Sequence, residues 1–186
     1  MPANAEIEIL EHHVAVQDVC AWPNLTPLPG GEILAAIFNA PSHGQMPGDV
    51  DAYVSADGGK TWALRGTVAK RDAADANRMN VAVGRVPDGT LVAVCSGYGS
   101  GPDTSVFLPT RVYHSRDAGA TWTDVGGFPL TPDGQPYVPF GDVLEGPDGA
   151  LYMTAYDYFV AERRADFFRS SDGGRTWEVQ GAIGEG

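Results

Sequence analysis

An imidazole and two carboxylates lie close together between residues 41 and 51 of the chain. His43 stands in the run Pro-Ser-His-Gly, whose composition is typical of a tight, exposed turn, and Asp49 and Asp51 follow a few residues later. Because a histidine titrates near neutral pH, beside a carboxylate it can transfer a proton or bind a sugar hydroxyl. These three residues are therefore the candidate catalytic residues. The alternative is that His43 serves only as a hydrogen-bonding residue in its loop.

Aromatic and polar side chains elsewhere in the chain have the chemistry of a carbohydrate site. The face of an aromatic ring stacks on the C–H face of a pyranose, and an arginine or asparagine can bind a substrate carboxylate or hydroxyl. Arg78 and Asn80 alternate onto one side of an expected strand. The candidate substrate-binding residues are Trp22, Arg78, Asn80, Tyr98, Asp142, Tyr156 and Tyr158, with Phe140 as a further aromatic platform. The alternatives are that the aromatic residues pack neighbouring sheets and that Arg78 forms a salt bridge.

Repeated motifs indicate the elements that must position these residues. The octapeptides SADGGKTW, SRDAGATW and SSDGGRTW occupy positions 55–62, 115–122 and 170–177, and all fit S-x-D-x-G-x-T-W. Their aspartates are spaced by 60 and 55 residues, and the last glycines of a second motif, in LPGGEI, VPDGTL and GPDGAL, are spaced by 58 and 60. Two independent markers with one period predict three copies of one structural unit.

The octapeptide has the composition of a tight turn between two strands. Its carboxylate and hydroxyl can accept hydrogen bonds from backbone N–H groups, its glycine can adopt positive φ, and its tryptophan can pack between neighbouring sheets. We therefore expect a structural and not a catalytic role for the octapeptides. The residues concerned are Ser55, Asp57, Gly59, Trp62, Ser115, Asp117, Gly119, Trp122, Ser170, Asp172, Gly174 and Trp177.

Each unit has the pattern of four short antiparallel strands, which is one blade of a β-propeller. The 24 glycines and 14 prolines punctuate short apolar runs, so the expected class is all-β. A P-D-G-like turn joins strands A and B of a blade, and the octapeptide joins strands C and D. We predict strands at 19–28, 33–39, 50–55 and 61–66, then 78–86, 90–96, 110–115 and 121–126, then 137–144, 150–156, 165–170 and 176–183. The three blades span about 14–66, 77–126 and 137–183 of a single partial propeller domain, 1–186, and segment 6–16 is a candidate outer strand.

This strand order places the octapeptides on one face of the propeller and the candidate site on the other. The B-to-C loops at 41–49, 96–109 and 156–166 lie on the face opposite the octapeptides, together with the starts of the A strands. The three loops differ in sequence, and function in repeat folds is typically carried by such variable loops.

The octapeptides resemble the Asp boxes of the sialidase-like superfamily of neuraminidase and BNR-repeat proteins, which carry them on six-bladed propellers. The resemblance covers nearly the whole chain and implies a carbohydrate-active protein, most simply a glycoside hydrolase of the exo-glycosidase type. It also implies that the acid/base aspartate of the family corresponds to Asp49 or Asp51. A catalytic sialidase would carry an arginine in an Arg-Ile-Pro-like motif, where this chain has Ala21-Trp22-Pro23. The arginines that would clamp a sialic acid carboxylate therefore do not map onto this sequence.

Two classes of function follow from this comparison. In the first, the protein is a glycosidase with Asp49 as acid/base, His43 and Arg78 as substrate contacts, and a nucleophile on blades absent from this chain. A lyase that uses His43 as base on a uronic acid is a close variant. In the second, the propeller is a non-catalytic scaffold for glycan binding or assembly, which the missing first-strand arginine favours.

The length of the chain predicts an incomplete ring. Six blades of about 60 residues would need roughly 360 residues, against the 186 in this chain. Half a ring leaves two blade faces and a strand edge uncovered. We expect them to be covered either by the missing half of the same propeller or, if the chain is complete, by a second copy in a homodimer.

Charge and hydropathy exclude other partners. The net charge of −12 repels phosphate backbones, so we expect no nucleic acid partner. The longest apolar run, 33–38, is far shorter than the ~20 residues of a membrane span, so we expect no membrane partner. Cys20 and Cys95 lack metal-ligand spacing and are expected to be buried free thiols, and we expect neither a metal nor a cofactor. Because the chain has no signal peptide, both a cytoplasmic location and secretion from a longer precursor stay open.

Overall fold

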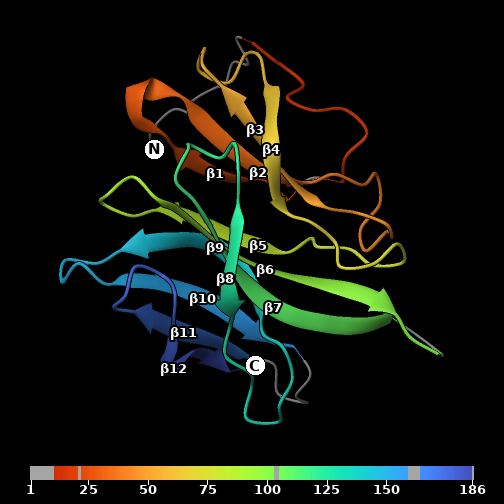
Figure 1. Cartoon of the computed structure of the whole chain (residues 1–186), viewed down its shortest axis with the longest axis vertical. Coiled ribbons are helices and arrows are strands. Elements are labelled where there is room, and N and C mark those ends of the chain that lie inside the picture. The colour runs from red at the N-terminus through yellow and green to blue at the C-terminus, as the bar shows by residue number, and fades with distance from the viewer. Residues whose placement is uncertain (1–10, 21, 103–104, 159–163, 186) are drawn as a thin grey trace, which may run out of the picture.

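The computed structural model describes residues 11–20, 22–102, 105–158 and 164–185. These residues form twelve β-strands and one short 3-10 helix, η1 (Pro29–Gly31), and contain no α-helix. Figure 1 shows the strands in three successive groups that follow the order of the chain from top to bottom. The predicted all-β class and its division into three four-stranded units are therefore confirmed.

Blade 1 is a separate sheet of four antiparallel strands in the order β1-β2-β3-β4. Its strands are β1 (Asn24–Pro27), β2 (Ile33–Phe38), β3 (Val50–Ser55) and β4 (Ala63–Ala69). β2 is apolar almost throughout because it is the second strand of the blade, with neighbours on both edges and packed residues on both faces.

Blades 2 and 3 share one eight-stranded sheet in the order β12-β11-β10-β9-β5-β6-β7-β8. Blade 2 consists of β5 (Val81–Arg85), β6 (Leu91–Ser100), β7 (Ser105–Ser115) and β8 (Thr123–Gly127). Blade 3 consists of β9 (Val138–Glu145), β10 (Leu151–Asp157), β11 (Arg164–Ser170) and β12 (Glu178–Glu185). A parallel bridge between Val83 and Asp142 joins the first strands of the two blades.

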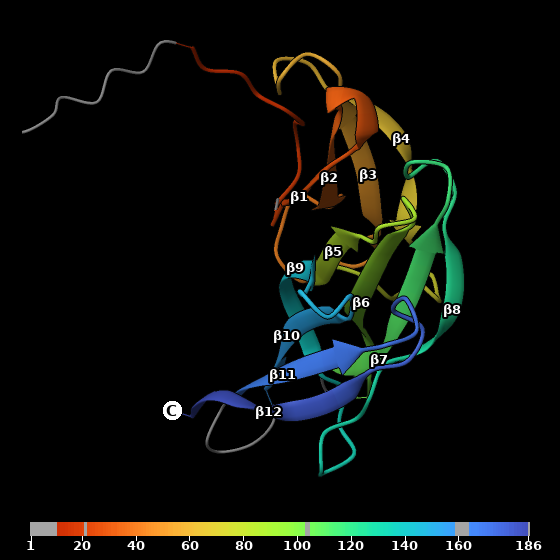
Figure 2. The same cartoon turned by 90° about the vertical axis from the view of Figure 1, so that its left-hand side faces the viewer.

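The first strand of each blade lies on the inner side of the curved assembly. In Figure 2, β1, β5 and β9 gather on one side of the molecule, whereas β4 and β8 lie on the other. Neighbouring inner strands that run parallel, each followed by an antiparallel four-stranded blade, are the arrangement of a β-propeller. The described chain therefore forms three blades of a sialidase-like propeller.

Each of the twelve predicted blade strands overlaps an observed one, but several boundaries differ, and the candidate outer strand is not seen in the described residues. Segment 96–109 is not a loop, because β6 continues to Ser100 and β7 begins at Ser105. The rings of Tyr98 and Phe107, paired across these strands with centroids 4.4 Å apart, extend the hairpin. The first inner strand begins only at Asn24, five residues later than predicted. Of the candidate outer strand 6–16, residues 6–10 lie outside the described residues, and 11–16 form no strand.

The three Asp boxes close their turns with the same hydrogen bonds. In each box the serine hydroxyl donates to the aspartate at 2.8 Å, and the aspartate accepts from the N–H and hydroxyl of the threonine. The tryptophan Nε1 donates to the carbonyl of the glycine in its own box. The bonds from Thr121 lower the pKa of Asp117 to about 2. Each box carboxylate is therefore already engaged inside its own turn.

Two apolar clusters join the blades. The first lies between blades 1 and 2 and is formed by residues such as Leu34, Val83 and Leu91. The second lies between blades 2 and 3, where the rings of Phe128, Tyr137 and Phe168 pack together. Because the interior is close-packed, these clusters fix the relative positions of the inner strands and of everything that projects from them.

The outward face of blade 3 is apolar and partly exposed. Tyr152 and Phe167 stack there with ring centroids 5.3 Å apart, and the exposed Leu144 is the cross-strand neighbour of Tyr152. In a complete ring this face would carry another blade. We still predict that further blades or a second copy of the chain cover this face.

Both cysteines are free thiols, as predicted, although Cys20 is only partly buried. Burial raises the pKa of the Cys95 thiol to about 12, which makes it unreactive. No helix in the described part of the chain has the length and apolarity needed to span a membrane.

Candidate functional site

The loops opposite the Asp boxes are tied to one another by backbone contacts. Gly48, in the β2–β3 loop, forms a parallel bridge with Asn77, just before β5. The Asn77 Nδ2 donates to the Gln45 carbonyl at 3.0 Å, and the Cys20 N–H donates to the Ala40 carbonyl at 2.7 Å. The segment that precedes β1, the β2–β3 loop and the segment that precedes β5 therefore meet on this face.

A cleft of about 430 Å³ opens on this face where the inner strands begin. All three blades contribute to it, each from the start of its first strand or the residues just before it. The lining side chains include Trp22, Asn24 and Leu25 from blade 1, Asn80 from blade 2, and Phe140 and Asp142 from blade 3. Three of the predicted substrate-binding residues, Trp22, Asn80 and Asp142, are thus brought together.

The polar groups of the cleft are two amides and one carboxylate. The buried Asn24 donates from Nδ2 to the Asp142 Oδ1 at 2.9 Å and also to the Gly141 carbonyl. Asn80, also buried, donates from Nδ2 to the Ser96 hydroxyl at 3.3 Å. Within the described residues, no hydrogen bond to the second carboxylate oxygen of Asp142 is seen. A few convergent polar groups in a concave, partly apolar site are typical of ligand-binding sites.

A row of four rings forms the rim of the cleft. The Trp22 ring lies 5.8 Å from His43 and 6.3 Å from Phe140, and Phe140 lies 5.3 Å from Tyr156. Trp22 is 52% exposed, Tyr156 is 45% exposed and His43 is also exposed, so three of the four rings belong to solvent-exposed residues. The prediction that these residues share one face is consistent with this row.

A second group of rings extends from the hairpin of blade 2. Tyr98 packs on Phe107, whose centroid is 5.9 Å from that of Tyr158. Tyr98 is partly buried, and this burial raises the pKa of its hydroxyl. Tyr158, in contrast, is exposed. These two predicted residues therefore lie beside each other but do not line the cleft.

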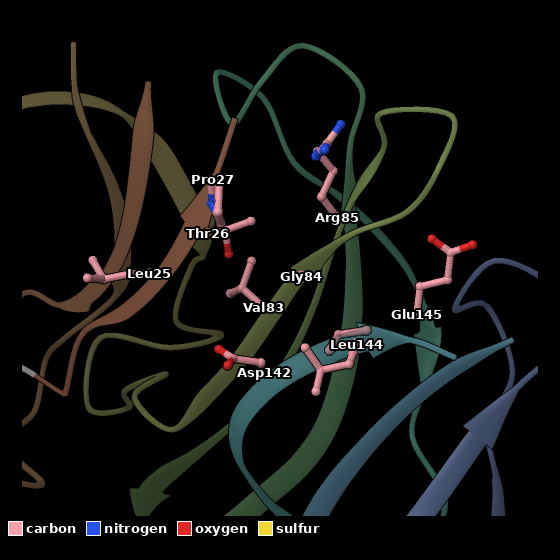
Figure 3. A pocket seen from close by; sticks show the side chains of 10 residues that line it. Leu25, Thr26, Pro27, Val83, Gly84, Arg85, Asp142, Leu144 and Glu145 are labelled. Carbon is pink, nitrogen blue, oxygen red and sulfur yellow. The ribbon is translucent and has the colours of Figure 1, made fainter. Parts of the chain in front are cut away.

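A groove of about 240 Å³ follows the inner strands away from the cleft. Figure 3 shows it between Leu25, Thr26 and Pro27 on β1, Val83 to Arg85 on β5, and Asp142 to Glu145 on β9. Leu25 and Asp142 line both the cleft and the groove. The two hollows are therefore continuous along the inner side of the half-ring.

The two carboxylates predicted as catalytic are held by hydrogen bonds away from the cleft. Asp49 accepts from the Arg71 N–H at 2.7 Å and from its guanidinium Nη1 at 2.5 Å. Asp51 is buried and accepts from the Asn39 amide and the Thr67 hydroxyl, both at 2.8 Å. These contacts anchor the β2–β3 loop to β4 and the segment after it. Of the predicted catalytic residues, only His43 reaches the rim, through its contact with Trp22.

Arg78 lies in the protein interior and not in the cleft. Its side chain is 1% exposed, and its guanidinium forms an ion pair with Asp72 and donates to the Pro109 carbonyl at 2.7 Å. This is the salt-bridge alternative considered from the sequence. The alternation of side chains along a strand predicted that Arg78 and Asn80 lie on the same side of the sheet. Residues 78–80 precede β5, so this alternation does not apply to them.

Sequence reasoning missed Asn24, the amide that holds Asp142. A signal was present, because Asn24 and Asp142 each lie five residues before the proline of their own A-to-B turn, Pro29 and Pro147. Asn24 and Asp142 lie on the inner strands of blades 1 and 3, and the inner strands of a propeller surround one axis. Within the described residues no group of His, Cys, Asp and Glu side chains has the geometry of a metal site.

Residues 31–185, most of the chain, match the BNR repeat-like domain. The chain belongs to this family. No curated protein matches it at a significant level.

Solved structures with the same fold include several sialidases. A protein of unknown function from Dyadobacter fermentans superposes with a TM-score of 0.74 at 20% identity, over 90% of this chain and 56% of that one. A sialidase from Trypanosoma rangeli in complex with the inhibitor DANA gives 0.68 at 15% identity, over 92% of this chain and 32% of that one. A mutant NanB sialidase from Streptococcus pneumoniae gives 0.67 at 11% identity, over 86% and 43%. This BNR-family chain therefore spans between a third and just over half of these proteins, and the likeness establishes the fold alone.

Proposed function

We propose that the cleft binds a carbohydrate and that the protein acts as a glycan-binding propeller module. The observation that carries the proposal is the exposed Trp22 ring beside Phe140, directly next to the Asn24–Asp142 pair. The face of an aromatic ring stacks on the C–H face of a sugar ring, and amide and carboxylate groups beside the aromatic ring form hydrogen bonds with the sugar hydroxyls. Asn24, Phe140 and Asp142 project from inner strands that the blade cores hold in place, and Trp22 lies two residues before β1.

The chemistry of the cleft favours a neutral sugar over an acidic one. Among the described residues that line it, the charged side chain is the carboxylate of Asp142, and none is an arginine or lysine. The chain as a whole carries a net charge of −12. A sialic or uronic acid would bring its own carboxylate into this negative environment without a guanidinium to pair with.

Titration with methyl glycosides of galactose, glucose, mannose and xylose tests this proposal, with saturation-transfer NMR as the readout and N-acetylneuraminic acid as the acidic comparison. We expect a neutral glycoside to bind, and Trp22→Ala to weaken its binding by about tenfold or more, because stacking at a central aromatic residue dominates such sites. Leu64→Ala, which removes an equally exposed apolar side chain from β4, is the matched control and should leave binding unchanged.

Two results would overturn the proposal. One is binding of N-acetylneuraminic acid without binding of any neutral glycoside, because the described lining of the cleft offers no cation to its carboxylate. The other is equal affinity for the neutral glycoside in the wild-type protein and in Trp22→Ala, because the ligand would then lie elsewhere.

Glycoside hydrolysis is the second candidate function, and it is favoured by the position of Asp142. This carboxylate lines both the cleft and the groove, and Asn24 orients one of its oxygens. It is therefore better placed than Asp49 to exchange a proton with a bound sugar. Release of nitrophenol from nitrophenyl glycosides measures this activity. Hydrolysis that survives unchanged in Asp142→Asn would exclude Asp142 as the acid/base.

A further inference from the structure

A second cleft lies on the opposite face, between the Asp boxes of blades 2 and 3. It has a volume of about 350 Å³, and its lining brings His114 and Arg116 from blade 2 together with Arg175 from blade 3. Thr123, the first residue of β8, adds a hydroxyl. Neither proposed function uses this cleft, because the carbohydrate site lies where the inner strands begin.

The internal repeat shows that blade packing does not require these cationic residues. Box 3 packs against blade 2 in the same way as box 2 packs against blade 1: a Cβ on Gly174 would meet Val92, and a Cβ on Gly119 would meet Leu34. The aligned positions are Val54, Ala56 and Ala120 at the first junction and His114, Arg116 and Arg175 at the second. Since alanines occupy both aligned positions at the first junction, the packing of the Asp box does not explain Arg116 and Arg175 at the second.

The two guanidinium groups in this cleft are available to a ligand. No hydrogen bond or ion pair joins the guanidinium of Arg116 or Arg175 to another residue that the structure describes. Asp117, which also lines the cleft, and Asp172 accept hydrogen bonds within their own boxes. Asp88 accepts from the Thr90 N–H at 2.9 Å, and its pKa is lowered by this contact with Thr90 and by the charge of Arg116.

The imidazole of His114 is fixed at the inner end of the cleft. The ring is buried, and its Nε2 lies 3.4 Å from the Gly174 carbonyl of the neighbouring box. His114 therefore holds the two boxes together at this junction, while the arginines extend toward solvent. A pair of unpaired arginines is unusual in a chain with a net charge of −12, where carboxylates outnumber cations two to one.

We propose that the cleft between boxes 2 and 3 is an oxyanion site that binds a sulfate or phosphate group through Arg116 and Arg175. Planar guanidinium groups bind tetrahedral oxyanions through paired hydrogen bonds, and two of them on facing blades can hold one anion from both sides. The Thr123 hydroxyl is a further donor. The anion is either the free ion or an ester group on a larger molecule such as a sulfated sugar, and the chemistry of recognition is the same.

Isothermal titration with inorganic sulfate, inorganic phosphate and galactose 6-sulfate tests the site, at an ionic strength of about 0.15 M so that unspecific attraction is screened. Arg116→Ala and Arg175→Ala introduce the residue that the first junction already carries, so both variants should fold. Each should weaken binding by about tenfold, which is the size of one lost charge-assisted contact. Lys60→Ala is the matched control, because Lys60 is the counterpart of Arg175 in box 1.

The outcomes separate the sources of the anion. Tighter binding of galactose 6-sulfate than of inorganic sulfate and of galactose assigns the site to an ester, whereas equal binding of the two sulfates assigns it to the anion alone. Trp22→Ala should leave the affinity for inorganic sulfate unchanged, so the proposals for the oxyanion site and for the carbohydrate site are tested independently. The proposal is overturned if no saturable binding occurs, or if the double variant Arg116→Ala/Arg175→Ala binds as the wild-type protein does.

Discussion

Gly84 is the position where the inner strands of blades 2 and 3 approach most closely. A Cβ at this residue would lie 1.8 Å from the Val143 carbonyl oxygen and 2.8 Å from the Val143 Cβ, whereas ordinary contacts are 3.4–4 Å. The obstacle is backbone of β9, which cannot move out of the way as a flexible side chain can. Gly84→Ala therefore forces the two inner strands apart.

The size of the effect follows from this geometry. The strands would have to separate by about 1.5 Å, and overpacking of this kind costs about 1–3 kcal/mol, with a rigid backbone contact at the upper end. For a chain of this length, 1 kcal/mol corresponds to about 2–4 °C in Tm. We therefore expect Gly84→Ala to lower Tm by roughly 6–12 °C.

Circular dichroism during heating and urea unfolding measure the change. Gly127→Ala, in β8, is the control: a Cβ there meets nothing within 4 Å, so the loss of backbone freedom in the unfolded chain should leave its Tm equal or slightly higher. Because Asp142 precedes Val143 and lines the cleft, Gly84→Ala should also weaken the proposed carbohydrate binding. A Tm for Gly84→Ala equal to that of the wild-type protein would refute the close approach of β5 and β9.

Two further predictions concern buried and turn carboxylates. Hydrogen bonds inside the boxes lower the pKa of Asp117 and Asp172 to about 2 from an ordinary 3.8, so their stabilisation is complete above pH 3.8 and is lost as the pH falls through 2. Tm should therefore decrease between these pH values, and less steeply in Asp117→Asn; a flat profile in the wild-type protein would contradict this. Tyr137→Phe removes a hydroxyl that donates to the buried Asp166 at 2.5 Å and should destabilise the fold by about 1.5–3 kcal/mol in urea unfolding. An unchanged urea midpoint would show that Arg164, the other partner of Asp166, compensates fully.

The candidate site was predicted in part because several of its residues follow the blade pattern. Trp22 and Asn80 come just before inner strands and Asp142 lies within one, and the strand order places these segments near one another. His43 was also correctly expected on that face, since it lies in a B-to-C loop. Arg78 lies in the interior because it precedes β5, and its guanidinium contacts the Asp72 carboxylate and the Pro109 carbonyl there.

The sequence by itself determined the strands, the turns and the propeller class. Those features depend on short-range rules, because an Asp box closes through atoms at most four residues apart and a blade strand is recognised from a few apolar residues. The tertiary structure alone decided which side chains meet. Asn24 contacts Asp142 across 118 residues, and Arg116 and Arg175 line one cleft at a blade junction, because the packing of the blades brings together residues that are distant in the sequence. Both clefts are products of that packing, which no local pattern encodes.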